Sequence, residues 1–210
     1  GVGYNIKHPA DQFRDNALMG IHLLDSCVKN GIQKIVLLGT ACSYPNGGGA
    51  KLKEISLWDG YPEQTNAPYA IAKRGIIEYA EACARQYSME VVNVISTNVY
   101  GPSKEITEDS HVIPSLVKRF SQAVEHGLDS VVVWGSGEAC RDFLYMDDCA
   151  QGIVHMAEVY DEDSPINIGS GYEVSIRKVA ETLKEISGFW GEIVFDPSKP
   201  TGQFHRCLDI

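Results

Sequence analysis

The chain lacks several features that would assign it to a specialised class of protein. None of its 210 residues belongs to an apolar run of about 20, so the sequence predicts no membrane-spanning helix. No signal peptide is visible at the N-terminus, and we therefore expect a cytoplasmic protein. Basic residues are outnumbered by acidic ones, and the formal net charge is −10. This balance argues against non-specific binding to nucleic acid.

The cysteines lack the spacing of a metal site or of a disulfide framework. No two of them form a C-x-x-C pair, so we expect reduced thiols and no zinc site. The six are Cys27, Cys42, Cys83, Cys140, Cys149 and Cys207. Hydrophobic residues make up 44% of the chain and charged residues 22%, as in a globular protein. The length fits one large domain, or a domain with a small lobe.

Strand-like and helix-like segments alternate along the chain. Continuous apolar runs of strand length are typical of parallel strands buried on both faces, and the run at 33–39 is one of them. Alternation of this kind predicts an α/β fold with a mostly parallel sheet. The expected strands are 33–39, 90–97, 131–134, 166–169 and 192–195, and the expected helices are 12–30, 68–87, 112–126, 176–187 and one opening at 146.

Helix-start signals support several of these segments. Pro68 fits the first turn of helix 68–87, where its missing N–H costs no hydrogen bond. Ser175 is expected to cap helix 176–187, and Asp147 and Asp148 are placed to cap the helix that opens at 146.

A Tyr-x-x-x-Lys pair stands on helix 68–87. Tyr69 and Lys73 share one helix face because they are four residues apart. A cation beside a phenol lowers the phenol's pKa from about 10, which would make Tyr69 a usable general acid near neutral pH. Such a pair occurs on many helices, so the interpretation depends on the surrounding motifs.

Those motifs resemble the extended short-chain dehydrogenases that act on nucleotide sugars, and most closely the GDP-L-fucose synthase branch. The resemblance covers nearly the whole chain. The similar stretches are LGTACSYP (38–45), APYAIAKRG (67–75), STNVYGP (96–102), SHVIPSLVKRF (110–120), VVVWGSG (131–137), RDFLYMDD (141–148), INIGSGYEVSI (166–176) and FDPSKPTG (195–202).

The resemblance implies a Rossmann-like parallel sheet with a small C-terminal α/β substrate lobe. Residues 1–101 would form a partial Rossmann domain that carries the catalytic helix. Residues 102–210 would form mainly the substrate-binding lobe, with Rossmann elements returning near 131–170.

The resemblance also implies two sets of catalytic residues. For reduction, Thr40 would hydrogen-bond the C4 carbonyl, Tyr69 would supply a proton, and Lys73 would bind the nicotinamide ribose. The family usually has serine where Thr40 stands, and threonine keeps the hydroxyl. For epimerisation at C3 and C5, Cys42 and His111 match the family's acid/base pair. Taken singly, Thr40 also fits a strand-end hydroxyl, Cys42 a small core residue and His111 a capping or surface group.

The implied cofactor is NADP, with NAD left open, and the implied substrate is a nucleoside-diphosphate sugar, GDP-linked in this branch. No metal is implied. A homodimer through helices 12–30 and 68–87 is expected. Lys118 and Arg119 also fit a solvated helix face. Cofactor binding is implied for Tyr69, Lys73, Thr97, Asn98 and His111, and substrate binding for Asn98, Lys118, Arg119, Trp134, Arg141 and Lys199.

One family element has no counterpart in this chain. The Gly-rich turn that binds the cofactor pyrophosphate is absent, and Gly47-Gly48-Gly49 lies in a polar loop without a helical pattern behind it. By the family pattern, Gly1 falls just after the third strand, and about 60 residues would precede it. We then expect strand 33–39 to be an exposed apolar edge.

Three functions stay open at this point. The first is epimerisation and reduction of a GDP-4-keto-6-deoxy sugar to GDP-L-fucose or a close relative. The second is another epimerase, dehydratase or reductase of nucleotide sugars, and the third is a truncated, non-catalytic fragment. Titration with NADPH separates the third function from the other two.

Overall fold

A three-stranded parallel sheet forms the centre of the larger part of the protein. The computed structural model describes residues 2–47, 51–103, 106, 110–162, 164–199 and 203–210. The sheet has the order β1-β2-β6, and each neighbouring pair is parallel. Its strands are β1 (Lys34–Thr40), β2 (Glu90–Ser96) and β6 (Ile166–Ile168). The α/β class predicted from the sequence is therefore confirmed.

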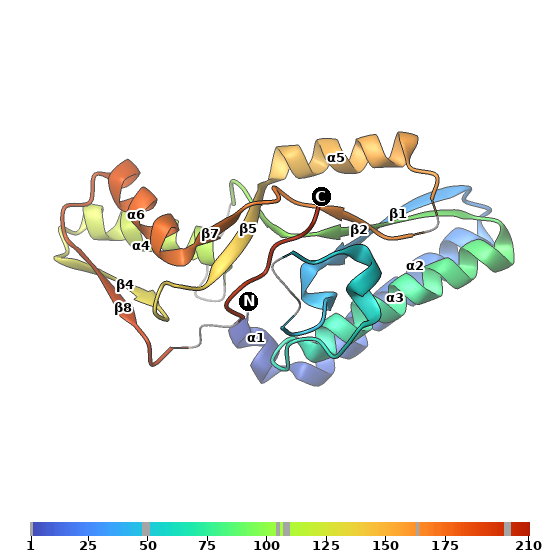
Figure 1. Cartoon of the computed structure of the whole chain (residues 1–210), viewed down its shortest axis with the longest axis horizontal. Coiled ribbons are helices and arrows are strands. Elements are labelled where there is room, and N and C mark those ends of the chain that lie inside the picture. The colour runs from blue at the N-terminus through green and yellow to red at the C-terminus, as the bar shows by residue number, and fades with distance from the viewer. Residues whose placement is uncertain (1, 48–50, 104–105, 107–109, 163, 200–202) are drawn as a thin grey trace.

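Helices cover both faces of this sheet (Figure 1). On one face, α2 (Pro9–Lys29) and α3 (Ala67–Tyr87) pack against each other and against β1, and α1 (Val2–Lys7) precedes them. The Tyr79 hydroxyl of α3 donates a hydrogen bond to Asp25 of α2 at 2.5 Å. On the opposite face, α5 (Met146–Val159) buries Met156 against Val92 and Val94 of β2.

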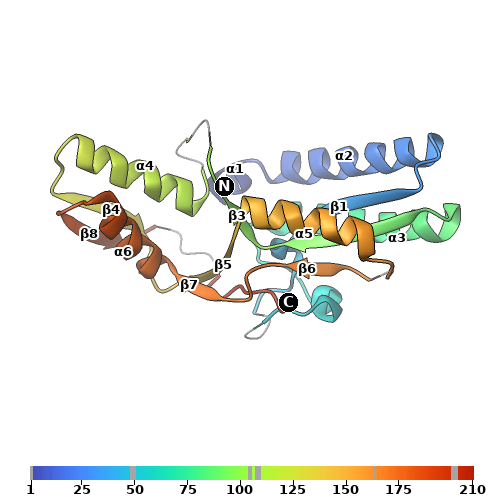
Figure 2. The same cartoon turned by 90° about the horizontal axis from the view of Figure 1, so that it is seen from above.

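A second part holds its own hydrophobic core and lies beyond one end of this sheet (Figure 2). In it, β4 (Ser130–Trp134) pairs in parallel with β8 (Glu192–Asp196), beside α4 (Val112–Glu125) and α6 (Ile176–Ser187). Val131 and Val133 of β4 are buried, whereas Val132 and Trp134 are exposed, as expected for a strand with one covered face. We call this part the lobe.

A third, short sheet connects the two parts. Its order is β3-β5-β7, with strands β3 (Asn98–Tyr100), β5 (Cys140–Tyr145) and β7 (Glu173–Ser175). These three strands and α1 were not predicted from the sequence. Of the elements within 131–170, α5 and β6 return to the central sheet, while β4 belongs to the lobe.

Most of the expected helices and strands are present within one or two residues. Ser175 caps α6, because its hydroxyl accepts the N–H of Lys178 at 3.1 Å. The expected capping of α5 is wrong: its N-cap is Tyr145, and no side chain makes a cap hydrogen bond there. Asp147 and Asp148 instead lie in the first turn, where their charges still favour the helix dipole.

The strand expected at 33–39 lies at an edge of the central sheet. Leu38 of β1 is 47% exposed, which confirms the exposed apolar edge. The same observation makes burial on both faces wrong for β1, in which only Leu37 is buried. Burial on both faces does hold for β2, in which Val92 to Ser96 are all buried. This strand lies between β1 and β6 in the sheet.

A buried asparagine of the central sheet ties distant segments together. The Asn167 side chain of β6 accepts a hydrogen bond from the Tyr44 hydroxyl at 2.7 Å. Its amide group donates to the carbonyl oxygens of Leu52 at 2.9 Å and Asp209 at 3.0 Å. Burial raises the pKa of Tyr44, so the phenol stays a neutral donor. This network fixes the C-terminal residues against the turn that follows β1.

Candidate active site

A cavity of about 550 Å³ brings together all five predicted catalytic residues. They come from the end of β1, the turn after it, α3 and the start of α4. The carboxyl ends of parallel strands are where α/β folds place their ligand sites. The five are Thr40, Cys42, Tyr69, Lys73 and His111.

The turn after β1 is fixed by hydrogen bonds at both of its ends. Thr40 caps the short 3₁₀ helix Ala41–Ser43, and its hydroxyl accepts the N–H of Cys42 at 3.2 Å. Arg74 of α3 is buried and donates to the carbonyl oxygens of Ser43 and Gly60, the latter at 2.8 Å. Because α3 also carries Tyr69 and Lys73, Arg74 fixes Cys42 relative to that pair.

Burial dominates the protonation of the Tyr69–Lys73 pair. Desolvation raises the pKa of Tyr69, the nearby Cys42 charge raises it further, and the interaction with the Thr40 hydroxyl opposes them. Desolvation also lowers the pKa of Lys73. The structure therefore contradicts the expected lowering of the Tyr69 pKa, because the phenol loses more solvation than any nearby cation restores.

His111 is available to the cavity. It is the N-cap residue of α4, but its side chain makes no cap hydrogen bond, which removes the capping alternative. Loss of solvation lowers the pKa of His111, and the positive charge of Arg206 adds to this effect. A neutral imidazole at neutral pH can accept a proton, as a general base must.

Two residues expected to bind cofactor or substrate also make structural hydrogen bonds. The Thr97 hydroxyl is buried and donates to the carbonyl oxygen of Asp142 at 2.9 Å. The Asn98 amide donates to the same oxygen at 2.9 Å. Both line the cavity, and both hold β3 to β5. Their contact with a ligand stays a prediction.

The cations expected to bind the nucleotide lie on the lobe or beside it. Arg119 stacks over the Trp134 ring at 5.2 Å, and Lys199 lies 6.0 Å from the same ring. The described residues that line the cavity do not include Arg119, Lys199 or Lys118. Lys118 is half-buried and donates to the carbonyl oxygen of Ile106 at 2.7 Å, so it is not a freely solvated side chain.

Arg141 is held by the C-terminal segment. Its guanidinium donates to the carbonyl oxygens of Cys140 at 2.7 Å and Gln203 at 2.6 Å. Burial lowers its pKa to about 10, and the neighbouring charge of Arg206 contributes. A cation held in this way remains suited to an anionic ligand.

Several residues that line the cavity were not predicted from the sequence, and among them Arg206 carries a charge. It lines the cavity, and its guanidinium lies 3.0 Å from the sulfur of Cys42 and 3.3 Å from the Asn98 side-chain oxygen. It is the only Lys or Arg after Lys199 in the chain. No local pattern distinguishes it, because its contact to Cys42 spans 164 positions.

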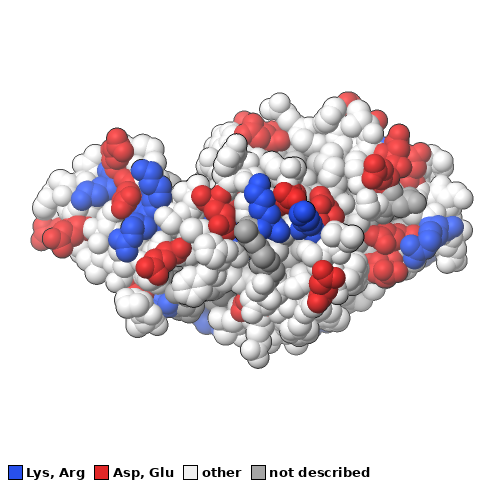
Figure 3. Space-filling model, in the orientation of Figure 1, with Lys and Arg blue, Asp and Glu red and all other residues white. Residues whose placement is uncertain are grey.

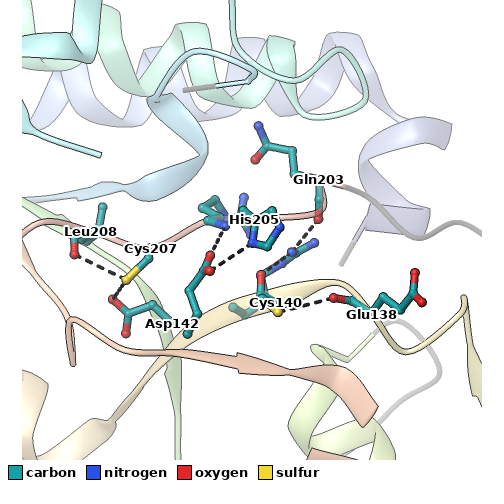
Figure 4. Close-up of polar contacts among 10 residues, drawn as sticks. Glu138, Cys140, Asp142, Gln203, His205, Cys207 and Leu208 are labelled. Atoms are coloured by element: carbon teal, nitrogen blue, oxygen red, sulfur yellow. Dashed lines mark hydrogen bonds and ion pairs between the residues drawn. The ribbon is translucent and has the colours of Figure 1, made fainter. Parts of the chain in front are cut away.

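The segment that carries Arg206 runs beside β5 (Figure 4). The N–H of Cys140 donates to the Phe204 carbonyl at 2.7 Å, and the N–H of Asp142 donates to the Arg206 carbonyl at 3.2 Å. Asp142 is fully buried, and its carboxylate accepts hydrogen bonds from the N–H and the hydroxyl of Ser170. The two backbone hydrogen bonds hold the segment alongside β5.

One group of side chains has the composition of a metal site. Ligand atoms of Cys140, Glu173 and His205 lie within 4.8 Å of one another. The Glu173 carboxylate already accepts the N–H of Arg206 at 2.9 Å and lies 3.0 Å from the His205 ring nitrogen. Through these hydrogen bonds the Glu173 side chain holds the C-terminal segment in place.

Charge on the surface is divided into small groups. On the face seen in Figure 3, the basic side chains stand in separate groups, each with acidic neighbours. Within the described part of the chain, no helix is both long and apolar enough to cross a membrane.

Fold and site together define an α/β protein with a Tyr–Lys pair at the carboxyl ends of its parallel strands. The chain belongs to the NAD dependent epimerase/dehydratase family, whose model matches residues 1–169. Members of this family are enzymes of the extended short-chain dehydrogenase type.

Individual relatives narrow the comparison to GDP-sugar enzymes. A GDP-L-fucose synthase of Escherichia coli (strain K12) is 37% identical to this chain, and the match covers 100% of the chain and 68% of the relative. A solved GDP-L-fucose synthetase from Naegleria fowleri bound to NADP is 31% identical with a TM-score of 0.86, over 94% of this chain and 64% of that one. A GDP-mannoheptose C4 reductase from Campylobacter jejuni with NADP bound is 28% identical with a TM-score of 0.87, over 98% and 68%. The chain thus spans about two thirds of the length of these relatives.

Proposed function

We propose that this chain is part of an NADPH-dependent enzyme that epimerises and then reduces a GDP-4-keto-6-deoxy sugar to GDP-L-fucose or a close relative. The observation that carries the proposal is the meeting of Thr40, Tyr69, Lys73, Cys42 and His111 in one cavity. The two activities need different groups, and this cavity holds a set for each. The names of the GDP-L-fucose synthase relatives support the GDP-linked substrate.

The residues around Lys73 fit a nicotinamide cofactor. Lys73 is half-buried and lines the cavity, and its ammonium group makes no hydrogen bond or ion pair with another described residue. It is therefore free to donate to ribose hydroxyls. When bound, the reduced cofactor supplies a hydride. The NADP-bound relatives favour NADP over NAD.

Reduction requires a proton at the oxygen that becomes a hydroxyl. Tyr69 donates this proton to the C4 oxygen of the substrate, since its raised pKa keeps the phenol protonated at neutral pH. The Thr40 hydroxyl hydrogen-bonds the same oxygen and orients it. Lys73 adds a positive charge that stabilises the phenolate left after transfer.

Epimerisation requires a proton to leave one face of the sugar and another to arrive on the opposite face, at C3 and at C5. A thiolate and an imidazole can both exchange protons near neutral pH. We assign this exchange to Cys42 and His111, which enter the cavity from the turn after β1 and from the start of α4.

The nucleotide end of the substrate is assigned to the cations near and on the lobe. Arginine makes paired hydrogen bonds to phosphate oxygens, and an indole ring can stack on a base. Arg141 donates to the Gln203 carbonyl of the C-terminal segment, and on the lobe Arg119 and Lys199 both lie near the Trp134 ring. Lys118 on α4 and Asn98 on β3 complete the proposed substrate contacts.

The test is turnover with a panel of keto-sugar nucleotides, followed as NADPH oxidation. We expect GDP-4-keto-6-deoxymannose to be used best, with UDP- and dTDP-linked sugars used at least tenfold less well. Reduction of an already epimerised ketone, without hydrogen exchange at C3 and C5, would instead support a simple C4 reductase like the Campylobacter relative. Absence of NADPH binding at any substrate concentration would contradict both functions.

A homodimer is part of this proposal. The structure indicates a different interface from the one expected, because the apolar residues of α3 are not available to a partner. Ile76, Ile77 and Ala80 of α3 are buried within the chain, and Tyr79 is bonded to Asp25, so they offer no free apolar face. The exposed apolar side chains lie on α2 instead. They are Phe13, Leu18, Met19, Ile21 and Leu23.

We expect a mass of twice the 23.1 kDa chain by light scattering at micromolar concentration. Met19→Glu, which charges a 63% exposed side chain, should convert the dimer to monomer because a buried unpaired carboxylate is costly. Ile186→Glu charges an exposed side chain of the lobe and should leave the mass unchanged. A monomeric mass for the unaltered protein would refute the dimer.

A further inference from the structure

The Arg206 guanidinium makes a direct contact to the sulfur that the proposed epimerisation uses. One terminal nitrogen lies 3.0 Å from Cys42 Sγ, and the other lies 3.3 Å from Asn98 Oδ1. A guanidinium has only donors, so the sulfur must accept this hydrogen bond. An ionised acceptor makes a charge-assisted bond that is about twice as strong as a neutral one.

Arg206 is held in place by its backbone and its neighbours. Its carbonyl accepts the N–H of Asp142, and its own N–H donates to the Glu173 carboxylate at 2.9 Å. His205 contacts the other Glu173 oxygen at 3.0 Å. Figure 4 shows His205 and Cys207, the neighbours of Arg206 in the chain, beside β5. Because the segment is fixed on both sides, Arg206 points at Cys42 without a large loss of side-chain freedom.

The charge balance of the cavity favours an anion at this position. The described residues that line it include the cations Lys73 and Arg206 but no Asp or Glu, although the whole chain has a net charge of −10. The titratable groups that interact with Cys42 or Arg206 are Tyr69, His111, Arg141 and, through the Arg206 backbone N–H, Glu173 of β7. Glu173 does not line the cavity as described, and Tyr69 is neutral near pH 7, so Cys42 is the one of these groups that can place an anion in the cavity.

We propose that Arg206 is a positioning residue that holds Cys42 as a thiolate facing the cavity. The proposal rests on the proposed function only for the use of that thiolate, which is to remove a proton from C3 or C5 of the substrate. The ionised sulfur itself is a property of the chain and is measurable without substrate or cofactor.

The experiment measures the rate at which iodoacetamide alkylates Cys42 across a range of pH, read by mass spectrometry of the Cys42 peptide. Iodoacetamide is uncharged, so Arg206 does not change its approach. The thiolate is the reacting form, and each rate is divided by the plateau rate at high pH to remove differences in access. The half-buried Cys140 gives an internal comparison in the same samples.

We expect Arg206→Gln to move the midpoint of the Cys42 profile to higher pH and to slow alkylation at pH 7 by about three- to tenfold. Arg206→Lys keeps the charge and should stay closer to the unaltered protein. Arg85→Gln removes an exposed arginine near the end of α3 and should leave the profile unchanged. Arg206→Met serves as a second uncharged variant if Arg206→Gln does not fold by circular dichroism.

An unchanged midpoint in a folded Arg206→Gln or Arg206→Met variant would overturn the proposal. Equal slowing by Arg206→Lys and Arg206→Gln would also overturn it, because charge would then not be the cause. Neither result depends on epimerase activity, so failure of the proposed function would be seen separately, in the turnover assay.

Discussion

Tyr69→Phe should lower the rate of ketone reduction by about 10²–10⁴-fold while the protein stays folded. Phenylalanine keeps the ring and removes only the hydroxyl, which interacts with the Thr40 side chain in the cavity. The substrate oxygen then lacks its proton donor at the moment of hydride transfer. Single-turnover oxidation of NADPH with a pre-epimerised ketone measures this step alone.

Tyr87→Phe is the matched control, since it removes a hydroxyl at the exposed end of the same helix. It should leave the rate within about twofold. Because desolvation raises the pKa of Tyr69, the unaltered protein should keep its reductase rate through neutral pH and lose it only under alkaline conditions. Hydride transfer at the normal rate in Tyr69→Phe would show that another group donates the proton.

Cys42→Ser should abolish exchange of the substrate C3 and C5 hydrogens with heavy water, or reduce it by at least about 10²-fold. Serine has nearly the same shape, but its hydroxyl is far less acidic than a thiol and does not ionise near neutral pH. The reductase residues Thr40, Tyr69 and Lys73 are unaltered. The variant should therefore still reduce a pre-epimerised ketone, or release a product with the wrong stereochemistry.

Cys140→Ser is the control for this substitution, because Cys140 is also a half-buried free thiol and does not line the cavity as described. Deuterium incorporation, measured by NMR at each carbon, separates the two positions. His111→Asn should impair exchange as well, since one residue serves each face of the sugar. Undiminished exchange in both Cys42→Ser and His111→Asn would remove epimerisation from the proposed function and leave a ketoreductase.

Local patterns in the sequence predicted most of the central helices and strands. Helical periodicity identified α2 and α3, and the short strands β1 and β2 followed from continuous apolar runs. Strands β3, β5 and β7 were not predicted, because segments such as CRDFLY in β5 mix charged and apolar residues without clear alternation. Their pairing comes from contacts with distant segments, which local periodicity does not record.

The candidate catalytic residues were identified in two ways: Tyr69 and Lys73 by their four-residue spacing, and Thr40, Cys42 and His111 by the resemblance of the surrounding motifs to a known family. The sequence could not give their electrostatics. It suggested that Lys73 would lower the pKa of Tyr69, whereas the packed structure raises that pKa because burial removes water from the phenol. The solvation of Tyr69 depends on the assembled cavity, so the spacing of residues along one helix does not predict it.

The sequence alone thus determined the class of fold and the chemical groups available to the site, because helix and strand periodicity and residue type are local properties. Only the tertiary structure decided which groups meet. Arg206 contacts Cys42 across 164 positions, and Thr97 and Asn98 bind the Asp142 carbonyl across 45 and 44. The connecting sheet brings these segments together through long-range backbone pairing, and the resulting distances and burial set the charge on each catalytic group.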